Sequence, residues 1–117
     1  MDIHFTARKF KPHQAIRDHA LATIKKLDKY FDGIVRSDII LSFEGKDPSL
    51  KTAEINVHVF GSVLIAKERS DEFLKSIDMA LEKIERQLDK YKAKHRAKNK
   101  KTLRKIKEVD VVEQIEE

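Results

Sequence analysis

The sequence predicts an α+β fold with the element order βαβββα: a four-stranded, mainly antiparallel sheet with two helices packed on one face. Two segments repeat apolar residues at every third or fourth position, as amphipathic helices do. Four shorter segments are rich in β-branched residues and alternate apolar with polar side chains, as half-buried strands do. A chain of 117 residues holds one core of modest size, so both helices are expected to bury their apolar sides on the same sheet face.

The N-terminal part of the chain predicts a strand followed by a helix. Residues 2–7 alternate between apolar and polar side chains. Between Pro12 and Phe31 apolar residues recur at helical spacing, and Pro12 suits the first helical turn because no backbone N–H partner is needed there. Gly33 lies where a glycine commonly ends a helix.

Three strands are expected in the middle of the chain. Residues 37–45 and 51–61 are alternating, β-branched runs, and the segment between them is rich in the turn formers Gly, Asp, Pro and Ser. Residues 61–69 follow at once as the fourth strand. Gly61 and Ser62 are the expected tight turn between the last two strands.

The second helix is expected to begin near Ser70 or Asp71, whose side chains can accept hydrogen bonds from free backbone N–H groups. No large apolar residue lies between Tyr91 and Leu103, so this helix should leave the domain and fray within residues 92–98. Its apolar stripe consists of Phe73, Ile77, Leu81, Ile84, Leu88 and Tyr91.

The charges of the chain are segregated along the sequence. The net charge is +5, but residues 90–107 contain ten Lys or Arg and no Asp or Glu, whereas residues 108–117 contain five acids. A solvated helix face seldom lacks every acid over such a length, so this run predicts a polyanionic partner. The outward sides of the two helices can add a continuous basic surface formed by Lys25, Lys26, Lys29, Lys83, Arg86 and Lys90.

Residues 1–98 are the predicted domain, and residues 99–117 are expected to be a flexible charged tail. Three states of residues 107–117 are compatible with the pattern. The acids can fold back on the basic run as a mimic of nucleic acid, the segment can stay disordered, or it can form a short strand or helix that meets a partner.

The motifs of catalysis and cofactor binding are missing from the sequence, so we expect no enzyme, no cofactor, no metal site and no small-molecule substrate. The three glycines are scattered, so no phosphate-cradling loop exists. The five histidines lack metal-ligand spacing and are interpreted as surface or partly buried polar residues. Tyr30 and Tyr91 each continue an apolar stripe and are interpreted as edges of the core rather than platforms for bases.

The compartment is expected to be the cytoplasm. The sequence has no cysteine, which fits a reducing environment. It also has neither an apolar N-terminal signal segment nor an apolar run long enough to cross a bilayer, so no contact with a membrane is expected.

Several segments resemble the short ribosome hibernation factors, the family that includes hibernation promoting factor and ribosome-associated inhibitor A. SDEFLKSID (70–78) is similar to the family pattern EDMYxAID, and KIERQLDKYK (83–92) is similar to KLERQLxKxK. AIRDHALATIKKLDKYF (15–31) is similar to PAIRxHVxxKLxKLxxxF. Weaker likenesses lie in residues 4–10, 38–44 and 61–68, so the resemblance covers residues 1 to about 98.

The resemblance implies a βαβββα domain that sits on the small ribosomal subunit, in the channel of mRNA and of the tRNA anticodon stems. It implies that the protein silences translation under stress or in stationary phase, and that it is monomeric off the ribosome. The partner is then small-subunit rRNA. The residues that match the family's RNA contacts are Arg17, Lys26 and Lys29, then Lys83, Arg86 and Lys90, with Lys92 and Lys94 as further contacts to the RNA backbone.

The sequence departs from the family pattern at two places. The proline expected directly before Ala15 is absent and Pro12 lies earlier, which predicts a shifted helix start. The family's Met-Tyr is replaced by Glu72 and Phe73, which removes a hydroxyl group that could contact RNA. Two alternative functions stay open: a general RNA- or DNA-binding protein, and a protein-interaction regulator of the sigma-factor-modulating type.

Overall fold

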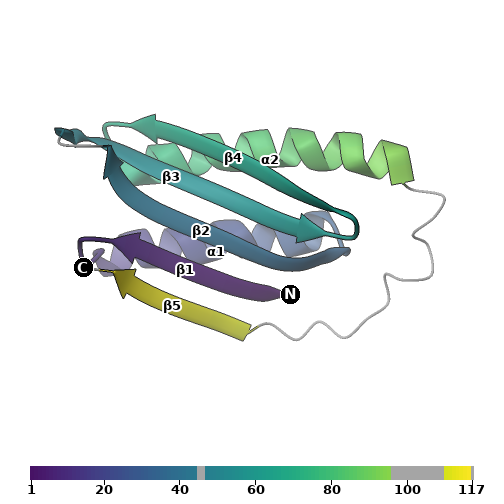
Figure 1. Ribbon diagram of the computed structural model, residues 1–117, viewed down its shortest axis with the longest axis horizontal. Coiled ribbons are helices and arrows are strands. Elements are labelled where there is room, and N and C mark those ends of the chain that lie inside the picture. The colour runs from purple at the N-terminus through teal and green to yellow at the C-terminus, as the bar shows by residue number, and fades with distance from the viewer. Residues whose placement is uncertain (45–46, 96–109, 117) are drawn as a thin grey trace.

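The computed structural model describes residues 1–44, 47–95 and 110–116. The α+β class and the βαβββα order are confirmed, and both helices lie on the same side of the sheet (Figure 1). The elements are β1 (Asp2–Arg8), α1 (Gln14–Tyr30), β2 (Ile34–Glu44), β3 (Asp47–Val59), β4 (Ser62–Ser70), α2 (Phe73–His95) and β5 (Asp110–Glu116).

The sheet has the strand order β4-β3-β2-β1-β5. β2, β3 and β4 pair antiparallel through two hairpins. β1 is parallel to β2, because α1 connects them by crossing over one face of the sheet. The pairs β4–β3 and β3–β2 are therefore antiparallel, whereas β1 is parallel to both of its neighbours, β2 and β5.

A fifth strand is added to the four that the sequence predicts. Residues 110–116 form β5, which pairs in parallel with β1 at the edge of the sheet (Figure 1). Of the states compatible with the sequence, this part of the segment forms a strand, and the partner that it meets is this chain's own β1. The rest of the predicted tail, 99–109 and 117, lies outside the described residues, as does the end of the predicted fraying region beyond His95.

The core lies between the helices and one face of the sheet. The apolar stripe predicted for α2 lies on this core, with Leu81 half-buried and its other members buried. At one end of the core the rings of Phe10, Phe43 and Phe73 cluster with centroid distances of 5.0 to 5.5 Å. At the other end Tyr91 packs edge-on against Phe31 and donates a hydrogen bond to the Phe60 carbonyl oxygen at 2.7 Å.

The ends of α1 differ from the prediction. The helix begins at Gln14 with His13 at the cap position, so Pro12 lies before the helix and is buried in the connection from β1. Phe31 is extended directly after the last helical residue. The helix therefore ends before Gly33, which lies in the turn that leads into β2.

The beginnings of β4 and α2 also differ. Val59 pairs with Ser62, so the tight turn consists of Phe60 and Gly61, and Gly61 adopts the positive φ of 76° that favours glycine. α2 begins at Phe73, later than predicted. The hydroxyl of Ser70 accepts a hydrogen bond from the Glu72 N–H at 3.2 Å and orders the chain just before the helix.

Truncating Ile84, whose side chain is fully buried in α2, should destabilise the fold by about 2 to 5 kcal/mol, because the substitution Ile84→Ala leaves a cavity between helix and sheet. Met79→Ala on the exposed side of the same helix is the matched control and should change stability by less than about 0.5 kcal/mol. Urea unfolding measures both. Equal losses would contradict the packing of α2 described above.

Candidate nucleic-acid interface

α1 and α2 lie side by side on the sheet and run parallel. His19 Nε2 lies 2.8 Å from Asp78 Oδ1, and the Tyr30 hydroxyl donates a hydrogen bond to Asp89. Each contact joins residues that are 59 positions apart, so the offset between the helices is constant along the seam. The outward sides of the two helices consequently face the same way, away from the sheet.

The three lysines predicted on α1 are available to a ligand. Lys25, Lys26 and Lys29 are exposed. Within the described part of the chain none of them forms an ion pair or a side-chain hydrogen bond. Lys29 also lies in the last turn of α1, where the helix dipole favours a positive charge.

Arg17, the fourth basic residue predicted on α1, is engaged by β5. Its Nε donates to Glu113 Oε2 at 2.9 Å, and its Nη2 lies 2.9 Å from the same oxygen. Its Nη1 donates to Gln14 Oε1 at 3.0 Å. All three nitrogens of the guanidinium group therefore have a partner, and the side chain is only 22% exposed.

The three basic residues predicted on α2 differ in whether an acidic side chain pairs with them. Lys90 is exposed and has no ion-pair partner in the described ranges. Arg86 lies 3.9 Å from Glu82 one turn earlier, and since both side chains are largely exposed, that pair is weak. Lys83 forms an ion pair with Glu68 of β4. Lys83 thus lies on the margin of α2 that faces β4, away from α1.

The C-terminal ends of the two helices meet at Tyr30. Lys92 Nζ lies 4.2 Å from the centroid of the Tyr30 ring and 3.4 Å from the Tyr30 carbonyl oxygen, while Lys94 is exposed. The interpretation as a core edge is right for Tyr91, which is 6% exposed, and wrong for Tyr30, which is 38% exposed. The hydroxyl of Tyr30 reaches Asp89 across the seam, which keeps the ring at the surface.

Acidic residues line the α2 side of the seam. Asp78 and Asp89 make the contacts across it, and Glu85 is close enough to act on the charge state of Tyr30. The hydrogen bond to Asp89, with burial and the charges of Asp89 and Glu85, raises the pKa of Tyr30 to about 12. The basic surface is therefore divided by an acidic seam rather than continuous, and Tyr30 remains a neutral hydrogen-bond donor within it.

Basic residues on the strands form ion pairs with acidic residues more often than those on the helices do. Arg36 Nε donates to Asp38 at 2.7 Å, and Arg69 lies 3.1 Å from Glu44. His58 also lies against Asp38, at 3.2 Å. The histidines whose side chains are described are exposed or half-buried, as interpreted from the sequence. The unpaired cations thus concentrate on the helices.

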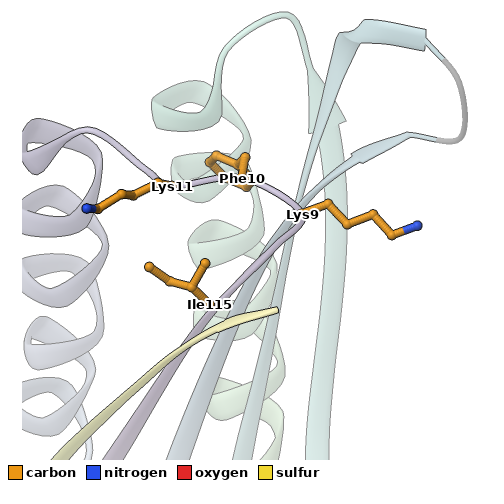
Figure 2. A pocket seen from close by; sticks show the side chains of 4 residues that line it. All are labelled: Lys9, Phe10, Lys11 and Ile115. Carbon is orange, nitrogen blue, oxygen red and sulfur yellow. The ribbon is translucent and has the colours of Figure 1, made fainter. Parts of the chain in front are cut away.

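Two basic residues were missed by the sequence analysis. Lys9 and Lys11, in the connection between β1 and α1, line a groove of about 630 Å³ with Phe10 and Ile115 (Figure 2). Their ammonium groups point in opposite directions, and Lys9 has a positive φ of 65°. The sequence RKFK (8–11) does show three basic residues around one aromatic residue. That this segment lies beside β5 can be known only from the fold.

Neither a metal site nor a membrane-spanning helix is found in the part of the chain that the structure describes. In that part, no three His, Asp or Glu side chains converge as a metal site would require. The helices α1 and α2 are not apolar over a stretch that would cross a bilayer, and this holds for the described residues.

The model of the family described as sigma 54 modulation protein / S30EA ribosomal protein matches residues 3–96. The chain belongs to this family. It is 31% identical over 94 residues to the ribosome hibernation promoting factor of Klebsiella oxytoca, a match that covers 80% of this chain and 96% of that protein. The chain is thus a homologue of hibernation promoting factors, which are not enzymes, and the prediction of a protein without catalysis is confirmed.

Solved structures agree with this assignment. A ribosomal subunit interface protein from Coxiella burnetii superposes with a TM-score of 0.71 at 29% identity, covering 80% of this chain and 99% of that one. The N-terminal domain of Protein Y from Thermus thermophilus superposes with a TM-score of 0.66 at 29% identity, covering 78% of this chain and 99% of that one. β5 lies beyond the residues that match the family model.

Replacing Asp89 with Asn should lower the pKa of Tyr30 from about 12 towards its ordinary value of 10, because the charged acceptor is removed. The raised pKa means that the contact stabilises the fold below pH 10, and that this stabilisation is lost as the pH rises through 12. Ultraviolet titration in a Tyr91→Phe background measures Tyr30 alone, since the chain has two tyrosines. An unchanged titration in Asp89→Asn would contradict the described hydrogen bond.

Proposed function

We propose that this protein binds the small ribosomal subunit in the cytoplasm and silences it by occupying the channel of mRNA and tRNA under stress or in stationary phase. The proposal is supported by membership of a family described in part as ribosomal, and by relatives named as hibernation promoting factors and as a subunit interface protein. Occupancy of the site blocks translation in this account, and no bond is made or broken.

The observation that carries the proposal is the concentration of unpaired cations on the two parallel helices. Five lysines, Lys25, Lys26, Lys29, Lys90 and Lys94, have no partner within the described residues, and Arg86 is held only weakly. A cation that keeps no partner in the folded protein binds a phosphate without first breaking an ion pair. Phosphate contacts of this kind supply affinity and fix orientation without reading sequence.

The shape of the surface fits structured RNA. Double-stranded RNA is recognised by its shape and by contacts to phosphates and 2′-hydroxyl groups, which rows of side chains on rigid helices can reach. Lys92 and Lys94 extend the rows at the C-terminal end of α2. Between the rows, the acids of the seam repel phosphates, so we propose that each helix contacts its own stretch of RNA backbone.

Lys83 and Arg17 are secondary contacts in this proposal. At both residues a phosphate has to compete with a carboxylate, Glu68 at Lys83 and Glu113 at Arg17. Removing either residue should therefore cost less affinity than removing a lysine that is already free.

Reversing two charges on α2, in the variant Arg86→Glu with Lys90→Glu, should abolish binding to small subunits while leaving the fold intact, because both side chains are exposed. Each lost phosphate contact lowers the slope of log affinity against log salt by about 1, so any residual binding should show a slope lower by about 2. Filter binding at several salt concentrations measures both quantities.

A matched control carries the same charge change on the other side of the sheet. Lys67 and Arg69 of β4 alternate with Glu68, which reaches α2, so they point away from the helices. The variant Lys67→Glu with Arg69→Glu should keep most of the affinity. Equal losses in the two double variants would mean that only net charge matters and that the helix face is not the interface.

Co-sedimentation with small subunits, with and without bound mRNA and initiator tRNA, tests the location. Binding should be salt-sensitive and lost when the channel is filled. Equally effective competition by naked duplex RNA would instead identify a general polyanion-binding protein. A stoichiometric protein complex that persists at high salt would favour the sigma-factor modulation that the family's description also names.

A further inference from the structure

β5 covers the side of the domain where Arg17 lies. It pairs with β1 in parallel along its whole length, from Asp2 opposite Asp110 to Arg8 opposite Glu116. The strand lies at the free edge of the sheet, next to the α1 side of the helix layer (Figure 1). In this place Glu113 reaches across to α1 and holds Arg17.

The contact occupies the edge of the Arg17 guanidinium group that is formed by Nε and Nη2. A carboxylate and a phosphate accept hydrogen bonds from a guanidinium group through the same donors, so one largely excludes the other. Nε and Nη2 are both directed at Glu113 Oε2, and Nη1 is directed at Gln14. A phosphate can take the bidentate Nε and Nη2 edge of Arg17 only if Glu113 gives it up.

β5 is an edge strand with a single neighbouring strand, β1. Among the described residues it packs substantially on β1 alone, and its two described apolar side chains, Val112 and Ile115, remain partly exposed. An edge strand whose described apolar side chains are exposed can open locally at a lower free energy than global unfolding. β1 would stay in the sheet when β5 leaves, because it is also paired with β2.

We propose that β5 is a resident competitor of RNA: its Glu113 occupies Arg17 in the free protein, and β5 is displaced when the RNA backbone binds there. This inference rests on the function proposed above and adds a regulation of the same site. Displacement also removes Ile115 from the groove that it lines with Lys9, Phe10 and Lys11 (Figure 2). Two exposed lysines then border the opened edge.

The consequence is selectivity for the ribosome. A short or irregular RNA makes few contacts and pays the cost of removing β5 from a small total affinity. A small subunit that contacts both helices offsets this cost with many phosphates. The cost raises both dissociation constants by the same factor, so the occupancy by weakly bound incidental RNA falls while a tightly bound ribosome stays nearly saturated.

A double-mutant cycle tests the competition in the full-length protein with small subunits and with a naked RNA duplex as probes. Glu113→Gln should tighten binding about two- to fivefold, the range expected for releasing one partly exposed ion pair. Arg17→Gln should weaken binding. In the Arg17→Gln background, Glu113→Gln should have no effect, because the competition for Arg17 no longer exists.

Other outcomes of the cycle overturn the inference. An equal gain from Glu113→Gln in both backgrounds would mean that Glu113 acts only as a general negative charge. A loss of affinity would mean that Glu113 positions Arg17 for RNA, and an unchanged affinity would mean that the pair is irrelevant. If the wild-type protein itself fails to bind small subunits, the proposed function fails instead, which is a separate result.

A covalent lock tests displacement of the strand. His4 and Val112 are opposite each other in β1 and β5, and the chain has no cysteine of its own, so His4→Cys with Val112→Cys offers a single possible disulfide. The oxidised protein should bind small subunits more weakly than its reduced form, and each single-cysteine variant should bind equally under both conditions. Equal binding by the locked and reduced forms would show that β5 stays in place on RNA.

Discussion

The arrangement of both helices on one face of a single sheet is the constraint on which the rest of the structure depends. The chain builds one core, and the apolar stripes of α1 and α2 can be buried only against the same sheet face. Because the two helices then run parallel with a constant offset, their polar sides face outward together. A surface that spans two rigid helices follows directly from how the core is filled.

Electrostatics divides this surface into parts with different roles. At the seam, acids of α2 meet His19 and Tyr30 of α1, which fixes the offset between the helices. At the margins, Glu68 of β4 and Glu113 of β5 hold Lys83 and Arg17. Free cations remain along the outward sides, where Lys25, Lys29 and Lys90 lie. These acids therefore each contact a specific side chain, in addition to lowering the net positive charge of the surface.

The sequence predicted what depends on local pattern and missed what depends on register between distant elements. The stripe from Phe73 to Tyr91 predicted α2 because helical periodicity is visible within one segment. β5 could not be assigned, because its pairing with β1 joins residues about a hundred positions apart and three of its seven residues are charged. For the same reason the acids that restrain Arg17 and Lys83 could not be predicted from the sequence.

The orientation of the protein on its target is the central claim, and a cryo-electron microscopy structure of the small subunit with this protein bound tests it most directly. The account predicts density in the mRNA and tRNA channel, with α1 and α2 towards rRNA and with Lys25, Lys29 and Lys90 within hydrogen-bonding distance of phosphate oxygens. Binding outside the channel, or binding through the open face of the sheet with the helices towards solvent, would contradict it.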